Sequence, residues 1–162
     1  MASDFVHLHL HSEYSLLDGA CRISEIPAAA KAAGHSAVAI TDHGVMYGAV
    51  EFYKACKEAG IKPIIGCEVY VARRTMNDRD RYLDLPSYHL ILLVKNETGY
   101  RNLTVLTSHA FTDGFYSKPR IDLDLLREHT DGLIALSACL AGFIPRPIVA
   151  GDYDSAREHA LM

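Results

Sequence analysis

The sequence contains no tryptophan and no long hydrophobic segment among its 162 residues. Its longest apolar runs, such as the one from Leu90 to Val94, are far shorter than the roughly 20 residues that a membrane-spanning helix needs. The first residues show no basic stretch followed by an apolar one, so the sequence predicts no secretory signal. We therefore expect a cytoplasmic protein without contact to a membrane.

Cysteine and positive charge are both scarce. The four cysteines, Cys21, Cys56, Cys67 and Cys139, form no C-x-x-C pair, so we expect reduced thiols rather than disulfides. Sixteen Lys and Arg residues face twenty Asp and Glu residues, which gives a net charge of −4. A protein that binds nucleic acid through its overall charge is basic, so any contact with DNA or RNA depends on a local site here.

Several catalytic motifs are also missing. The sequence has no G-x-S-x-G nucleophile elbow, no glycine-rich P-loop and no dinucleotide-binding fingerprint. What it does contain is the composition of a globular domain, with 49% hydrophobic and 22% charged residues. Its length is that of one domain with a sizeable core. Histidine is the residue type that stands out, with nine copies.

Hydrophobic periodicity predicts alternating strands and helices. The segments expected to form strands are 5–11, 36–41, 62–71, 88–94 and 132–137. Helices are expected over 24–33, 48–59, 97–110 and 122–129, and the polar segment 73–86 is expected to be an exposed loop. This order indicates an α/β fold with a parallel sheet and right-handed crossovers. Five strands are too few to close the usual eight-stranded barrel.

The last residues predict the beginning of another helix. Ser155 and Glu158 fit a capping box, Asp154 is a rival cap, and the chain stops after fewer than two turns. Because a domain rarely stops inside a new helix, we expect residues 1–162 to be the N-terminal piece of a longer protein. The alternative is a complete domain closed by a short helix.

The first predicted strand carries three histidines in one phase. His7, His9 and His11 recur every second residue, so a strand would place all three on one face. Neutral imidazoles are good ligands for divalent transition metals, and a pair at a strand end is a natural metal site. The alternative is a histidine-rich strand that packs on polar neighbours.

Other candidate ligands sit where predicted strands meet loops. Asp18 lies in the turn after the first strand, His43 directly follows the second, and Cys139 follows the fifth. Glu68 lies inside an apolar strand, where a carboxylate is costly unless it is paired or metal-bound. A salt bridge to Lys or Arg is the alternative. His89 sits near the start of its strand and is left out by this positional argument.

The ends of parallel strands converge on one face, so His9, His11, His43 and Glu68 are expected to meet, with Cys139 able to join them. A cluster of several His with carboxylates suits Zn²⁺ or Mn²⁺. More ligands than one ion needs indicate two or three ions, and such centres hydrolyse phosphoesters. In a separate basic loop, Lys118 and Arg120 are either solvated, which is favoured, or in contact with DNA phosphates.

These residues resemble the PHP (polymerase and histidinol phosphatase) family, whose H-x-H motif matches His9-Leu10-His11 and whose D-H motif matches Asp42-His43. Within it, the chain is most similar to the N-terminal domains of bacterial replicative DNA polymerase III α subunits. The segments that carry this similarity are 5–19, 40–44, 60–66, 96–103, 114–122 and 136–142.

The resemblance implies a distorted seven-stranded β/α barrel with up to three metal ions, of which this chain would be the incomplete N-terminal part. The implied ligands are His9, His11, Asp18, His43, Glu68, His89 and Cys139, so the family includes His89 where strand position does not. It assigns no role to His7. Two further family ligands, in a D-x-H arrangement, would lie beyond Met162, as would the polymerase domains.

Three functions follow from this resemblance. The first is a metal-dependent 3′–5′ proofreading exonuclease within the full-length polymerase, which brings the domain to DNA and to the other replicase subunits. The second is a metal-stabilised structural domain that braces the polymerase and binds partner subunits without hydrolysis. The third is a free-standing phosphatase of the histidinol-phosphate kind, against which the polymerase-like segments argue. The intact ligand set favours the first.

Overall fold

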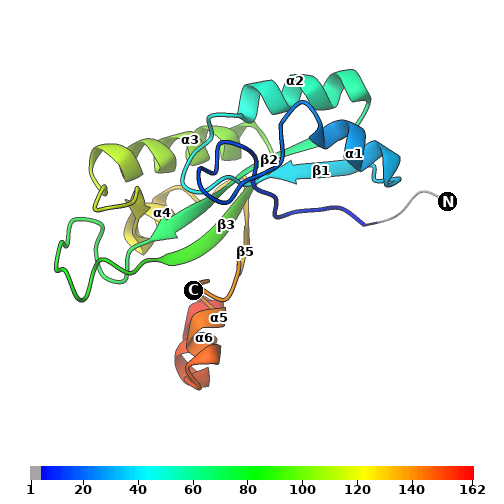
Figure 1. Cartoon of the computed structure of the whole chain (residues 1–162). Helices are drawn as coiled ribbons and strands as arrows, with labels where there is room; N and C mark the ends of the chain where they lie inside the picture. Colours follow the sequence, from blue (N-terminus) through cyan, green and yellow to red (C-terminus); the bar gives the residue numbers. More distant parts are fainter. Residues whose placement is uncertain (1–4) are drawn as a thin grey trace.

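The computed structural model describes residues 5–162. The elements follow one another as α1 (Ile26–Ala32), β1 (Ala37–Ile40), α2 (Ala49–Ala59), β2 (Lys62–Val71), β3 (Tyr88–Val94), α3 (Glu97–Thr112), β4 (Arg120–Ile121), α4 (Leu123–Glu128), β5 (Leu133–Leu136), α5 (Pro145–Val149) and α6 (Tyr153–Leu161). Figure 1 shows α1, α2 and α3 over the sheet, while α5 and α6 lie together beyond β5. The predicted α/β class is confirmed.

The strands form one mixed sheet in the order β1-β2-β3-β5, with β4 paired to β2. β1 runs parallel to β2, as expected. β4 was not predicted as a strand and also runs parallel to β2, whereas β3 runs antiparallel to both β2 and β5. The expectation of a parallel sheet is therefore wrong. The segment 72–87 contains no crossover helix and brings the chain back beside the end of β2. The next strand, β3, therefore starts there and runs antiparallel to β2.

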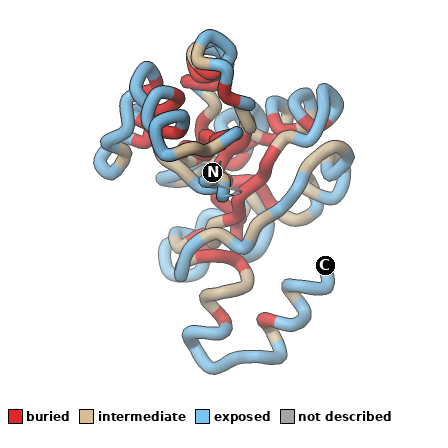
Figure 2. Tube along the Cα trace, turned by 90° about the vertical axis from the view of Figure 1, so that its right-hand side faces the viewer, coloured by how far each residue is buried: buried red, intermediate tan, exposed pale blue. Residues whose placement is uncertain are grey.

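Two hydrophobic clusters cover one side of the sheet and its β1 edge. Leu103 and Leu106 of α3 are fully buried against Cys67, Val69 and neighbouring strand residues. A second cluster packs α1 and α2 on β1 and includes the fully buried Phe52. β1 is buried throughout, as are the second half of β2 and the middle of β3, and Figure 2 shows buried stretches running through the middle of the molecule. This packing leaves the opposite face of the second half of β2 for polar residues.

The helix boundaries follow local signals. Asn96 caps α3 by accepting a hydrogen bond from the Gly99 amide, and Gly60 ends α2 in the left-handed region with φ +72°. The last helix differs from expectation, because Asp152 caps α6 by accepting from the Ser155 amide. Neither the Ser155 capping box nor Asp154 does so. The short α5 was not predicted, since its two prolines indicate a loop.

The N-terminal segment is not the predicted strand. Residues 5–11 have no strand assignment, although their carbonyls accept hydrogen bonds from the amides of Ala39 and Thr41 beside β1. His7 consequently does not share a face with the other two histidines and packs against Phe5 and His35. Within residues 5–162, none of the helices combines the length and apolar character that a membrane span requires.

Candidate metal centre

Glu68 is the charged residue at the centre of the site, and it lies in the second half of β2. Its side chain is only 1% exposed. Because side chains alternate along a strand, Cys67 and Val69 pack toward α3 while Glu68 and Tyr70 project from the opposite face. A buried carboxylate is costly without partners. The groups around Glu68 therefore determine what this site can do.

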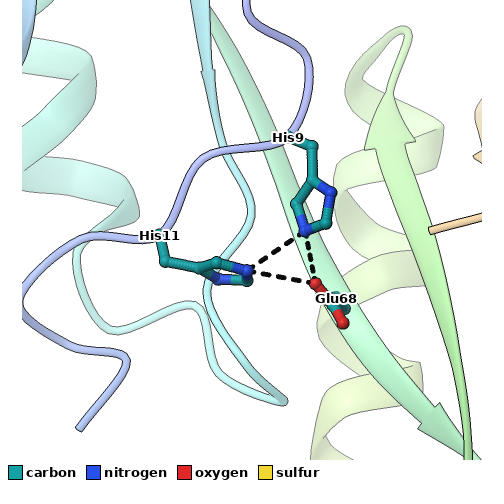
Figure 3. Close-up of side chains that lie close together, drawn as sticks. All are labelled: His9, His11 and Glu68. Carbon is teal, nitrogen blue, oxygen red and sulfur yellow. Dashed lines mark hydrogen bonds and ion pairs between the residues drawn. The ribbon is translucent and has the colours of Figure 1, made fainter. Parts of the chain in front are cut away.

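Two histidines reach Glu68 from the N-terminal segment (Figure 3). His9 Nε2 lies 2.5 Å from Glu68 Oε2, and His11 Nε2 lies 3.2 Å from the same oxygen. The two Nε2 atoms are 3.1 Å apart. The H-x-H spacing thus brings both imidazoles to one carboxylate oxygen, although the segment is not a regular strand.

A third histidine reaches the carboxylate from β3. His89 Nδ1 hydrogen-bonds Oε1 of Glu68. Because β3 runs antiparallel to β2, the start of β3 lies beside the end of β2, and His89 pairs with Tyr70. β5 reverses direction again, so its end returns to the same edge, where Cys139 Sγ lies 3.6 Å from His89 Nδ1. The positional argument that left out His89 is wrong because it assumed parallel strands.

His43 and Asp18 form the remaining side of the site. His43 follows β1, and the backbone around it bridges to β2 through hydrogen bonds with Glu68. His43 Nε2 lies 2.9 Å from Asp18 Oδ2, and its Nδ1 lies 3.7 Å from Glu68 Oε1. When Nε2–H donates to Asp18, the lone pair of Nδ1 faces the Glu68 carboxylate. This buried Nδ1 has no hydrogen-bond partner among residues 5–162.

A layer of hydrogen bonds behind the cluster orients His11. The buried carboxylate of Asp42 accepts from the Ser12 amide and hydroxyl and from the Ser15 hydroxyl. Ser15 Oγ in turn accepts from the His43 amide at 3.1 Å and lies 3.3 Å from His11 Nδ1. Since the single Ser15 proton goes to Asp42, His11 Nδ1 is the donor in that contact. Its Nε2 then faces the carboxylate as a lone pair unless it also binds a proton.

The electrostatics of the site keep Glu68 ionised. Burial alone raises the pKa of the Glu68 carboxyl, but hydrogen bonds from His11 and His89 and the charges of His43 and His89 outweigh it. The result is a pKa well below the usual range. The hydrogen bond to Glu68 raises the pKa of His11 against the opposing effect of burial. The negative charge of Glu68 thus attracts cations, and a proton bound to His11 is one way to balance that charge.

Metal ions are another way, and the donor set fits them. Two groups place one ligand atom per residue within 4.8 Å of one another: His9, His11 and Glu68, and His43, Glu68 and His89. Glu68 belongs to both groups. Lone pairs at His11 Nε2 and His43 Nδ1 pointing at a carboxylate need a cation between them. Imidazole with carboxylate is a donor set for Zn²⁺ or Mn²⁺. The five residues are called the His–Glu cluster below.

The structure therefore brings together all seven residues that the sequence and the resemblance single out. Asp18 contacts the cluster through His43, and Cys139 contacts it through His89. His7 stays outside it. The supporting residues Ser12 and Ser15 were missed, because two serines in a turn-rich stretch are unremarkable in sequence. A buried carboxylate at Asp42 that needs donors is the one signal that points to them.

The two basic residues of the loop, Lys118 and Arg120, differ in their burial and in their contacts. Arg120 is completely buried, and its guanidinium donates to the carbonyls of Gly114, Asp84, Met76 and Asp78. Both expectations for Arg120, a solvated side chain or a DNA contact, are thus wrong. These bonds hold the segment 72–87 on the sheet. Lys118 is exposed, and its Nζ lies 4.4 Å from the centre of the Tyr70 ring.

Residues 7–162 match the family described as PHP domain, and this match confirms the expected fold class. The chain is 54% identical over 157 residues to the DNA polymerase III subunit alpha of Treponema pallidum, covering 96% of this chain and 13% of the relative. It is 52% identical to the subunit of the same name from Borreliella burgdorferi, covering 98% of this chain and 14% of that protein. The chain thus spans about an eighth of these relatives.

A solved structure is also similar. The amidohydrolase from Chromobacterium violaceum matches with a TM-score of 0.46 and 26% identity, over 64% of this chain and 34% of that one.

Proposed function

This chain belongs to the PHP domain family, and from that membership we propose that the His–Glu cluster, with Asp18 and Cys139, binds up to three divalent metal ions and hydrolyses phosphodiester bonds. The observation that carries the proposal is the convergence of four imidazoles on one buried carboxylate. Zn²⁺ and Mn²⁺ are the ions that suit these donors. Bound ions would supply Lewis acidity and acidify coordinated water, which is the chemistry of phosphoester hydrolysis.

The protein's own residues would prepare the site for this chemistry. Glu68 offers Oε2 to the first ligand group and Oε1 to the second, so it couples the two. Asp18 accepts the Nε2 proton of His43 and so keeps Nδ1 available as a ligand atom. Ser15, held by Asp42, does the same for Nε2 of His11. These partners fix both rings before any ion binds.

We further propose the biological setting. The high identity to DNA polymerase III α subunits over nearly the whole chain supports its being the N-terminal domain of such a subunit in the cytoplasm. In that setting the substrate is the 3′ end of DNA, reached through the full-length polymerase, and the activity is 3′–5′ proofreading. Other replicase subunits would be its protein partners. The alternative function is a metal-stabilised structural domain without hydrolysis.

The test is digestion of 3′-labelled single-stranded DNA with added Mn²⁺ or Zn²⁺. The assay compares this chain, a polypeptide of the relatives' length, and that polypeptide with His9→Ala and His11→Ala. We expect metal-dependent digestion by the long polypeptide and little by residues 1–162, because the D-x-H ligands of the family would be missing. Misplacement of reacting groups by about 1 Å costs on the order of 100-fold in rate. Equal digestion by the double variant would favour the structural alternative.

A further inference from the structure

A lysine stands at the rim of the His–Glu cluster without an acidic partner. Lys118 Nζ sits over the face of Tyr70, which stacks on His43 with ring centres 6.0 Å apart. The same tyrosine forms a T-shaped pair with His89, with ring centres 5.2 Å apart. Tyr70 therefore contacts both the ammonium group and two members of the cluster. Within residues 5–162, Lys118 forms no ion pair with a carboxylate, although Glu68 and Asp18 make this part of the molecule acidic.

The loop that presents Lys118 is firmly held on both sides. Pro119 packs so closely on Gly44, next to His43, that a Cβ at Gly44 would lie 2.8 Å from Pro119 Cγ. Before it, the Tyr116 amide donates to the Lys118 carbonyl at 3.1 Å. After it, the chain enters β4 at the buried Arg120. The ammonium group is thus carried by a braced loop.

The same loop contains a residue in an unfavourable conformation. Ser117 has φ +63°, a left-handed backbone that costs a non-glycine residue free energy. Such conformations persist where the surrounding structure enforces them, and they concentrate at functional sites. Here the turn at Ser117 directs the next residue, Lys118, onto the Tyr70 ring.

From this geometry we propose that Lys118 binds a non-bridging oxygen of the phosphodiester that the His–Glu cluster hydrolyses. This inference rests on the proposed function and names its substrate-binding cation. An exposed ammonium group is a point charge that suits phosphate oxygens. The Tyr70 ring holds that charge beside the cluster while leaving its outer side open, because a cation–π contact occupies one side of the ammonium group only. The phosphate would contact Lys118 on that open side and the metal ions that the His–Glu cluster would hold.

The experiment measures binding of a fluorescent single-stranded oligonucleotide to the Mn²⁺-loaded chain by anisotropy at several salt concentrations. Two probes differ only in the last linkage, which is a phosphodiester or an uncharged methylphosphonate, and a gel confirms that each is intact. The variants are Lys118→Met, which removes the charge, and Lys118→Arg, which keeps it. Lys54→Met is the matched control, since Lys54 is exposed on α2. Metal content and melting temperature are measured for each.

We expect Lys118→Met to weaken binding of the phosphodiester probe roughly tenfold, as for loss of a hydrogen bond to a charged group. The slope of log K against log salt should fall by about 0.7, the value for one phosphate contact on a single strand. Lys118→Arg should restore both, and Lys54→Met should change neither. With the methylphosphonate probe, Lys118→Met should cause no further loss, because the charge it contacts is absent.

Unchanged binding by Lys118→Met, or an equal loss with both probes, would overturn the inference. Failure of the proposed function gives a different result. If Lys118→Met weakens binding of the phosphodiester probe only, but the protein digests no DNA, the phosphate site exists and the hydrolytic function does not. Conversely, a protein that digests DNA and is indifferent to Lys118→Met retains the proposed function and lacks the site.

Discussion

His89 Nδ1 hydrogen-bonds Glu68 Oε1 between two antiparallel strands, so a residue at the start of β3 holds the carboxylate in the second half of β2. His9 and His11 hold the other oxygen from a segment almost sixty residues earlier in the sequence. Glu68 therefore joins three separate parts of the chain at one point. A cation bound there would connect the same parts, which links metal binding to stability.

Metal removal should therefore destabilise the protein. An ion present at 100 times its Kd stabilises the folded state by about 2.7 kcal/mol, which for a chain of this size corresponds to roughly 5–10 °C in melting temperature. Calorimetry with and without a chelator should show this shift for the unaltered chain. His43→Ala should remove most of it, whereas His109→Ala, on the surface of α3, should leave it intact. Chelator-independent melting of the unaltered chain would contradict the account.

Ser15→Ala should weaken metal binding without removing any proposed ligand. Its hydroxyl connects Asp42 to His11 and to the His43 amide, and loss of such a partner behind a ligand typically costs 10–100-fold in metal affinity. The loss of one of the three hydrogen bonds to the buried Asp42 carboxylate should also lower the free energy of unfolding by about 1 kcal/mol. Titration with Zn²⁺ and chemical denaturation measure the two effects. Ser108→Ala, on an exposed part of α3, is the control.

Four of the five strands of the sheet could be predicted from sequence, but β4 and the strand directions could not, and the expected strand over 5–11 does not form. The predicted strands 62–71 and 88–94 coincide with β2 and β3, because both are apolar runs bounded by polar loops. An apolar run does not reveal whether its strand runs parallel or antiparallel to its neighbour, however. The exclusion of His89 assumed parallel strands and was wrong for that reason. Only the family resemblance supplied this residue. Arg120 was misjudged for a similar reason, since its partners are backbone carbonyls that carry no sequence signature.

Acidification should loosen the segment 72–87. The Arg74 guanidinium holds the pKa of Asp84 below its ordinary value of 3.8, against the opposing effect of burial. A lowered pKa means that this contribution to stability is complete above the ordinary value and is lost as the pH falls through the lower one. The NMR signal of the Asp80 amide, which donates to Asp84 Oδ2 at 2.7 Å, should report the change.

The expected midpoint of that titration lies below pH 3.8. In Asp84→Asn the Asp80 amide should not titrate with this group, and the segment should already be loosened at neutral pH. A midpoint at or above the ordinary value would show that the pair with Arg74 does not stabilise the folded state.

The metal content of the purified protein tests the central claim most directly. Elemental analysis after purification in non-chelating buffer would compare the unaltered chain with Glu68→Gln, which keeps the shape of the side chain and removes the charge shared by both ligand groups. Asp84→Asn makes the same chemical change at another buried carboxylate. The account predicts at least one equivalent of transition metal in the unaltered chain and in Asp84→Asn, and a large loss in Glu68→Gln. Less than one equivalent in the unaltered chain, or full retention in Glu68→Gln, would contradict it.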